Sequence, residues 1–305
     1  MENEIDEKVI APIKTKGILL VAAGHPYYGK MAAALAASIK TVDAEAVICV
    51  VKAGRGLAHL TDDEWSLFDS VIDAPADSYT IDGVANKWIK IKTRMYDLSP
   101  FDETLYLDVD MVWMHRKKVS EIFAELEPVD FTIQNRGHID LSEEAIDEKY
   151  SQWLNVSDVK EMYKIESGKY YSLHSEFVYF KKSEANKKYF NAVKKIYDKP
   201  KIETVEFAGA APDEFAFAIA CILMKKYPHE DKYLPVYWHY LDPSNQQTSE
   251  LSKFYCAYSV GGNILIGDMK KNYDRLARVG YNHFNLSYPF EAMDKKAFLT
   301  ERNKF

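Results

Sequence analysis

The sequence predicts an α/β domain in which a mostly parallel sheet is flanked by helices. Residues 17–24 form an apolar run closed by glycine, which is typical of a buried strand. An alanine-rich stretch beginning near Gly29 has helical periodicity, and residues 46–51 form a second run that is rich in β-branched side chains. A strand, a helix and a strand in this order make a βαβ unit, whose strands pair in parallel.

The remaining elements follow from the same periodicities. Trp88, Ile91, Met95 and Leu98 lie on one stripe, so a helix is expected over residues 88–98. Ser183 is a typical N-cap residue, and Pro212 is typical of a first helical turn. The other predicted elements are strands at 104–107, from 129 and around 177–180, and a charged helix within 140–165.

Composition limits the possible functions. The 305 residues carry a net charge of −7, which argues against a surface built for nucleic acid. Three distant cysteines suggest neither a disulfide framework nor a zinc site. No apolar run has the length of a membrane span and the start lacks a signal-peptide pattern, so we expect a cytoplasmic protein. Residues 1–15 are expected to be a flexible acidic tail, and 16–305 a single domain.

Two aspartates interrupt the apolar run "TLYLDVDMVW". In an extended segment, Asp108 and Asp110 point the same way, so both carboxylates converge on one spot. One interpretation is a strand that ends in solvent. The other is a site for a divalent cation, since a buried unpaired carboxylate is costly.

Several stretches together resemble glycosyltransferases of the GT-A fold, most closely the glycogenin-like family 8. "VAAGHPYYGKMAAALAASIK" is similar to the opening strand, loop and helix of that family. "KTRMYDLSPFDETLYLDVDMV" resembles its helix, turn and Asp-x-Asp strand. "HFNLSYPF" looks like a compressed form of its C-terminal His motif, and "PDEFAFAIA" resembles its helix-start segment more weakly. The four stretches occur in the order of the family.

The resemblance implies a retaining transferase that uses a nucleotide-sugar, with residues 16–135 binding the donor and residues 136–305 facing the acceptor. A Mn²⁺ or Mg²⁺ ion would stabilise the diphosphate that leaves. Asp110 would ligate this ion, Asp108 would ligate it or hold the ribose, and His283 would complete the ligation. A hydrogen-bonded structural histidine is the alternative at His283.

The resemblance also implies donor contacts. Tyr28 would stack on the base, whose edge the backbone of Ala22, Ala23 and Gly24 would read. His174 stands in "HSE", where the family has Asn-Ser-Gly, and is carried over as a donor-binding residue.

Two further residues are carried over with a catalytic role. Lys92 would meet the donor sugar or a phosphate, and Asp213 would lie near the anomeric carbon. The alternatives are a packed loop aromatic at Tyr28, a solvated lysine at Lys92, and at Asp213 a carboxylate favoured by the helix dipole.

The chain departs from the family at several points. Glu176 replaces a glycine and adds bulk and charge where the sugar or acceptor would lie. The C-terminal lysine of the family is missing, and Lys270 or Lys271 is the candidate substitute. Residues 232–247 are a possible acceptor lip, although an aromatic core segment is the simpler interpretation.

We therefore expect a metal-dependent glycosyltransferase that uses a UDP-sugar and an unidentified hydroxyl acceptor. The acceptor could be a glycan, a protein or a hydroxymethylated DNA base, the last suggested by eight lysines in residues 181–201. An anionic membrane surface is another alternative for these lysines, and a solvated helix face is the simpler interpretation. A phosphatase of the haloacid dehalogenase type, with Asp108 as nucleophile, is one alternative function. A non-catalytic nucleotide-binding protein is another.

Overall fold

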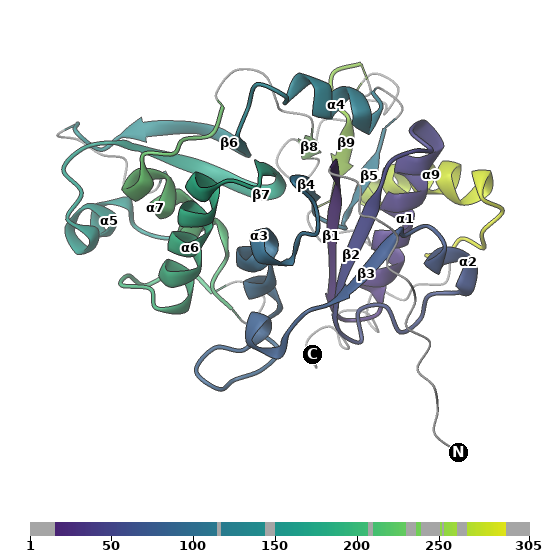
Figure 1. The fold of residues 1–305 in the computed structure, drawn as a ribbon, viewed down its shortest axis with the longest axis horizontal. Coiled ribbons are helices and arrows are strands. Elements are labelled where there is room, and N and C mark those ends of the chain that lie inside the picture. The colour runs from purple at the N-terminus through teal and green to yellow at the C-terminus, as the bar shows by residue number, and fades with distance from the viewer. Residues whose placement is uncertain are drawn as a thin grey trace.

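A six-stranded mixed sheet forms the centre of the computed structural model (Figure 1). The structure describes residues 16–114, 117–143, 150–206, 210–229, 236–238, 251, 253–260 and 267–290, without the side chains of 238 and 267–269. The tail predicted at 1–15 lies outside these residues, as does the possible acceptor lip apart from 236–238. The strands of the large sheet are β1 (Lys16–Gly24), β2 (Ile48–Gly54), β3 (Ser70–Asp73), β4 (Glu103–Leu107), β6 (Phe131–Asp140) and β7 (Lys169–Lys181).

The strand order is β3-β2-β1-β4-β7-β6. The first four strands in this order are parallel, whereas β7 is antiparallel to both β4 and β6. The predicted mostly parallel sheet is therefore confirmed. Because β1, β2 and β4 run in the same direction, their carboxyl ends lie on one edge, where open α/β sheets bind ligands.

A second, three-stranded sheet includes the strand that follows Asp110. It contains β5 (Met111–Trp113), β8 (Val236–Trp238) and β9 (Ala257–Ser259), in the order β5-β9-β8. Strand β9 is antiparallel to β5 and parallel to β8. Three-residue strands far apart in sequence carry little local pattern, so this sheet was not predicted.

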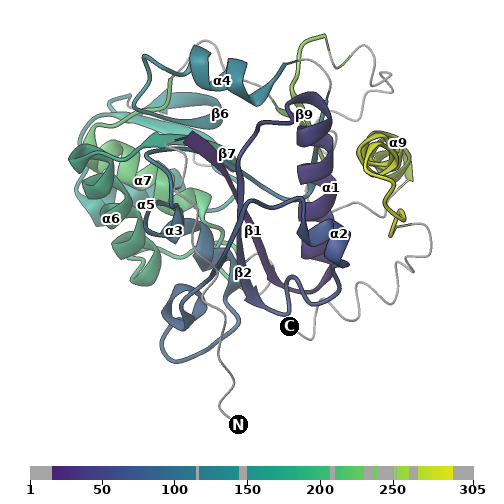
Figure 2. The same cartoon turned by 45° about the vertical axis from the view of Figure 1, so that its right-hand side comes forward.

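Helices cover both faces of the large sheet (Figure 2). The long helix α1 lies on one side with α9, and α3, α6 and α7 lie on the other. The helical elements are α1 (Tyr27–Val42), α2 (Asp62–Trp65), η1 (Ala76–Tyr79), η2 (Trp88–Arg94), α3 (Met95–Leu98), α4 (Val119–Glu125), α5 (Val156–Tyr163), α6 (Glu184–Asp198), α7 (Glu214–Met224) and α9 (Gly267–His283).

Strand β1 separates two hydrophobic clusters. Ile18, Leu20 and Ala22 face the cluster that contains α1 and α9, because side chains alternate along a strand. Leu19 and Ala23 face the opposite cluster, which contains η2, α6 and α7. All of these strand residues are buried, so β1 has no polar face, as expected for a central parallel strand.

Two predicted helices differ from the observed elements. The segment 88–98 is a 3₁₀ helix, η2, followed by the single α-turn α3. Of the helix predicted within 140–165, residues 156–163 form α5, whereas the described residues 150–155 are not helical. The Asn155 side chain accepts a hydrogen bond from the Ser157 backbone at 2.9 Å and therefore caps this helix at its start.

Helix α9 was not predicted, since the final 70 residues looked irregular. A buried network holds it in place: the Tyr281 hydroxyl donates to Glu64 at 3.0 Å, and Lys30 forms an ion pair with Glu64 at 2.5 Å. Gly280 lies against the α1 backbone, where an added Cβ would come within 2.8 Å of the Ser38 nitrogen. Among the described helices, none combines the length and apolar character needed to cross a bilayer.

Candidate functional site

The carboxyl edge of the sheet is built closely around glycines. Gly24 and Gly54 end β1 and β2, pair with each other, and adopt φ values of 75° and 58°. The Trp88 indole lies over both, since an added Cβ would come within 2.7 Å of it at Gly24 and 2.8 Å at Gly54. An added Cβ at Gly56 would lie 2.0 Å from the Ala22 carbonyl oxygen. The backbone at 22–24 is therefore enclosed by close neighbours at this edge.

Tyr28 lies in the first turn of α1, directly after this edge. Its ring is half-buried and packs against the α1 side of the core. His25, which the sequence analysis did not select, stacks on Tyr27 with ring centroids 4.9 Å apart and accepts a hydrogen bond from the Tyr27 backbone at 3.2 Å. Ala22, Ala23 and Gly24, which directly precede His25 in the chain, are buried. The structure thus brings the predicted base-binding residues together, while their contact with a base stays a prediction.

Asp108 is held by donors on both carboxylate oxygens. It follows β4, and its backbone nitrogen donates to the Glu176 carbonyl at 3.0 Å. Lys92 donates to Oδ2 at 2.6 Å, and the Tyr106 hydroxyl donates to Oδ1 at 2.5 Å. Hydrogen bonds to a charged partner are stronger than neutral ones, so this carboxylate is firmly oriented.

Lys92 joins three elements of the chain. Its ammonium also donates to the Ser175 hydroxyl of β7 at 3.3 Å and lies 3.9 Å from the Asp213 carboxylate. Burial disfavours the charged ammonium, but the Asp108 and Asp213 carboxylates outweigh it and raise the pKa of Lys92 well above its usual range. Lys92 therefore carries a positive charge between two carboxylates, and the alternative of a solvated helix lysine is wrong.

Asp213 is the N-cap residue of α7, but its side chain makes no capping hydrogen bond. It is 2% exposed, and its Oδ2 has no hydrogen-bond partner within the described ranges. Burial raises the pKa of Asp213 despite the nearby Lys92 charge. Burial, reinforced by the Asp213 charge, also raises the pKa of Glu214 to about 8. Two carboxyl groups with raised pKa values therefore stand at the start of α7, and that of Asp213 lies 3.9 Å from the Lys92 ammonium.

Asp110 and His283, the other two predicted metal ligands, come from the β4–β5 turn and from the end of α9. Asp110 lies in the turn that connects β4 to β5, and its carbonyl accepts a hydrogen bond from the Val260 backbone at 3.2 Å. Because residues 109–110 form a turn, the extended geometry assumed for Asp108 and Asp110 is not observed. His283 is exposed at the end of α9, with its ring against Phe284. Across the described ranges, no group of three or more histidine, cysteine, aspartate or glutamate side chains is arranged so that it could hold a metal ion.

His174 is buried in β7, opposite Gln134 of β6. Burial lowers the pKa of His174 to about 4, and the positive charge of Arg136 acts in the same direction. His174 is therefore neutral near pH 7. Glu176, two residues further along β7, is also buried, at 7% exposure. The strand that resembles the donor-sugar segment of the family thus carries a buried histidine and a buried glutamate.

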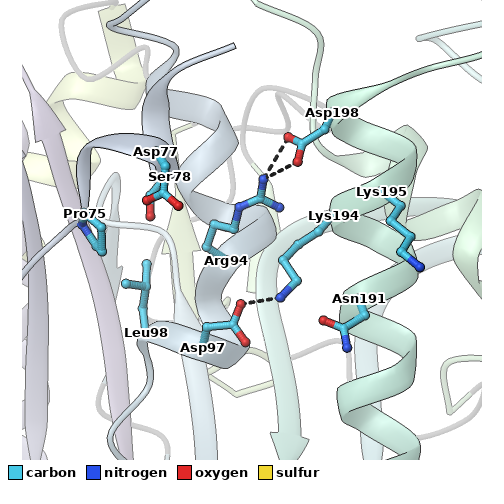
Figure 3. A pocket seen from close by; sticks show the side chains of 10 residues that line it. All are labelled: Pro75, Asp77, Ser78, Arg94, Asp97, Leu98, Asn191, Lys194, Lys195 and Asp198. Atoms are coloured by element: carbon cyan, nitrogen blue, oxygen red, sulfur yellow. Dashed lines mark hydrogen bonds and ion pairs between the residues drawn. The ribbon is translucent and has the colours of Figure 1, made fainter. Parts of the chain in front are cut away.

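A cavity of about 510 Å³ lies between η1, η2, α3 and α6 (Figure 3). Four of its charged side chains form two ion pairs with one another. Arg94 donates to both Asp198 oxygens at 2.8 and 2.6 Å, and Lys194 donates to Asp97 at 2.5 Å. Lys90 also lies 3.1 Å from Asp198. These ion pairs fasten η2, the element that carries Lys92, to the end of α6.

Comparison with solved structures identifies the fold. The bifunctional glycosyltransferase WbbM superposes with a TM-score of 0.53 and 10% identity over 86% of this chain. The galactosyltransferase LgtC, solved with donor and acceptor sugar analogues, gives 0.52 and 12% over 95% of this chain and all of its own. An active-site mutant of LgtC gives 0.50 and 13% over 88% of this chain and 96% of its own.

The chain spans about half (49%) of the length of WbbM. No protein-family model and no curated protein sequence matches it. At these identities the likeness concerns the fold. The chain therefore has the GT-A fold of these glycosyltransferases, as the sequence motifs predicted.

Proposed function

We propose that this chain is a glycosyltransferase that moves a sugar from a nucleotide donor, UDP-linked, to a hydroxyl acceptor. One observation carries the proposal: in a fold shared with glycosyltransferases, Lys92 joins Asp108 and Asp213 at the carboxyl edge of the sheet. This edge is where open α/β folds bind nucleotides. Retention of the anomeric configuration is proposed from the sequence resemblance alone.

The carboxylates at this edge supply part of the ligand set that a divalent cation needs. Asp108 and Asp110 supply oxygen ligands, which Mg²⁺ and Mn²⁺ prefer. Such ions keep several waters or substrate phosphates, so two protein carboxylates are an acceptable set. We propose that both residues hold the cation, with His283 as the predicted third ligand. The cation would stabilise the negative charge of the diphosphate leaving group.

The other residues bind and orient the donor in this proposal. Asp213 presents a buried carboxylate oxygen that lacks a hydrogen-bond partner within the described ranges, and a sugar hydroxyl would satisfy it. The Lys92 ammonium holds Asp108 and would add positive charge beside the diphosphate. We propose that Tyr28 stacks on the base, that the backbone of Ala22, Ala23 and Gly24 reads its edge, and that His174 lines the donor side.

The choice among acceptor classes depends on the lysine-rich run of residues 181–201. In the lysine-rich run, Lys181 and Lys182 donate to backbone carbonyls, and Lys194 pairs with Asp97. Lys201 lies over the Tyr163 ring. These contacts favour the interpretation of a structural helix face over a surface for DNA. A glycan or protein hydroxyl is the acceptor that we propose.

The test is nucleotide release from UDP-, GDP- and ADP-sugars with Mn²⁺ or with chelator. We expect slow Mn²⁺-dependent hydrolysis of a UDP-sugar. A p-nitrophenyl phosphate assay in the same buffers tests the phosphatase alternative, in which Asp108 would be the nucleophile. Phosphate release without donor hydrolysis, or a complete lack of donor binding by calorimetry, would contradict the transferase proposal.

A further inference from the structure

The cavity between η1, η2, α3 and α6 is lined by a different set of residues from the proposed donor site. None of its lining residues is among those proposed to bind the donor or the cation. Its volume of about 510 Å³ lies in the range of cavities that bind small molecules. One wall comes from η1 and the other from α6, and Arg94 of η2 lies between them (Figure 3). The cavity can therefore hold a molecule of the size of a sugar.

Positive charge is in excess on the side of α6 and η2. Lys90 and Arg94 share a single carboxylate, that of Asp198. Both Asp198 oxygens accept from Nη2 of Arg94, whereas its Nη1 is buried and has no hydrogen-bond partner in the part of the chain that the structure describes. Lys195 of α6 forms no ion pair with another described residue. Cations that are short of acceptors favour a ligand with negatively charged oxygens.

The opposite wall, from η1, offers hydrogen-bonding groups. Ser78 lines the cavity and is only 5% exposed, but its hydroxyl makes no hydrogen bond to another described residue. Buried hydroxyl groups in native proteins usually have a partner, so this one is available to a ligand or a water. The exposed Asp77 carboxylate lies beside it in the chain. A hydroxyl and a carboxylate together suit the hydroxyl groups of a sugar, which both donate and accept.

The remaining charged groups leave this polarity in place. Lys194 and Asp97 neutralise each other in an ion pair of 2.5 Å. The cavity and its immediate ion pairs hold four cations and three carboxylates: Lys90, Arg94, Lys194 and Lys195, with Asp77, Asp97 and Asp198. An oxyanion on the ligand would therefore meet a positive charge that the protein itself leaves uncompensated.

We propose that this cavity binds a sugar that carries an oxyanion group, either a phosphate or a carboxylate. The oxyanion faces Arg94 and Lys195, and the sugar hydroxyls face Ser78 and Asp77. Phosphate and carboxylate share the oxygen geometry that a guanidinium group recognises. This binding goes beyond the proposed transferase function and does not require it. Because Arg94 and Lys92 belong to the same short helix, the ligand would lie against the element that carries Lys92.

Calorimetry on the full chain tests the ligand class with three probes: glucose 6-phosphate, glucuronate and glucose. Each probe is titrated with and without excess UDP, which competes for a nucleotide site. We expect at least one charged probe to bind equally well in both conditions, and glucose to bind about tenfold more weakly or not at all, since it lacks the charged group. The charged probe that binds more tightly identifies the oxyanion as phosphate or carboxylate.

Three variants locate the binding. Ser78→Ala and Lys195→Ala should each raise the dissociation constant of the charged probe about tenfold, because each removes one hydrogen-bonding group from the cavity. Lys188→Ala is the matched control, since Lys188 is an exposed lysine of the same helix α6 that does not line the cavity, and its affinity should be unchanged. Without probe, Lys195→Ala and Lys188→Ala should melt at the temperature of the wild type, which shows that a loss of affinity is not a loss of folding.

Four results would overturn the inference. They are a lack of binding of both charged probes, equal binding of glucose, displacement of the probe by UDP, and unchanged affinity in both Ser78→Ala and Lys195→Ala. Donor hydrolysis is measured separately, so these results leave the transferase proposal as it stands. Conversely, failure of donor hydrolysis leaves the binding at this cavity intact.

Discussion

The Lys92 ammonium and the Asp108 carboxylate form the central ion pair of the site, with 2.6 Å between Nζ and Oδ2. Lys92 comes from η2 and Asp108 from the end of β4, sixteen residues later. The pair also approaches Asp213 at the start of α7. One positive charge therefore organises carboxylates from two separate elements, and the predictions below begin with its removal.

Lys92→Met should destabilise the protein by about 3 to 5 kcal/mol, because it leaves partly buried carboxylates without the ammonium group that pairs with them. Urea unfolding measures the loss. Asp108→Asn alone should also destabilise, but the double variant should lose less than the sum of the two single variants, since the unpaired charge is then gone. Strict additivity would show that Lys92 and Asp108 do not interact in solution.

Asp110→Ala should abolish Mn²⁺-dependent sugar-nucleotide hydrolysis and leave the fold intact. Asp110 lies in a turn and is bonded to Val260 through its backbone carbonyl, which the substitution keeps. We expect the free energy of unfolding to change by about 1 kcal/mol or less. Donor hydrolysis and circular dichroism are measured on the same sample. Full activity of a well-folded variant would refute the metal-binding role of Asp110.

Glu214 should make the protein less stable as the pH rises from about 5 to about 8. Its pKa is raised to about 8 in the folded state, first by burial and then by the Asp213 charge. The folded state therefore holds a proton that the unfolded state releases near pH 4.5, and the free energy of unfolding falls with rising pH in this window. Thermal unfolding at pH 5 and pH 8 should show a smaller difference for Glu214→Gln. Equal differences for both proteins would contradict this assignment.

His174 should make the protein less stable as the pH falls, which is the opposite direction to the effect of Glu214. Burial lowers its pKa to about 4 in the folded state, whereas the unfolded residue binds a proton near pH 6.5. Stability from this residue is therefore lost as the pH falls from 6.5 towards 4. Comparing the stability of His174→Gln and wild type across that range measures the contribution. An unchanged pH slope would mean that His174 is solvated in the native state.

Asp198→Ala should loosen the connection between η2 and α6, since Asp198 is the shared partner of Arg94 and Lys90. Asp198 is 38% exposed, so we expect a loss of about 1 kcal/mol or less. Lys195→Ala is a suitable control. Lys195 lines the same cavity and makes no ion pair within the described ranges, so its replacement should leave the melting temperature unchanged.

The sequence predicted those parts of the fold whose signals are local. The glycine-closed strand β1 and the helix α1 that follows it were recognised because burial on both faces and helical periodicity are visible within a few residues. The N-terminal capping residue of α6, Ser183, was recognised for the same reason. Such features need no knowledge of distant partners.

Other features depend on contacts between distant segments. The buried network of Lys30, Glu64 and Tyr281 joins residues more than two hundred positions apart, so α9 and its place on α1 could not be read locally. The roles of Tyr106 and Ser175 in the site were missed for the same reason. Conversely, sequence resemblance selected Lys92 and Asp213, and the structure brings their side chains together.

The Trp88 ring fills the space in which side chains at two strand ends would otherwise lie. Positions 24 and 54 are therefore restricted twice, by the ring and by their positive φ values. A smaller residue at position 88 would remove the first restriction and leave the second. Whatever binds at this edge thus meets bare backbone at the ends of β1 and β2, and side chains that contact it must come from other positions.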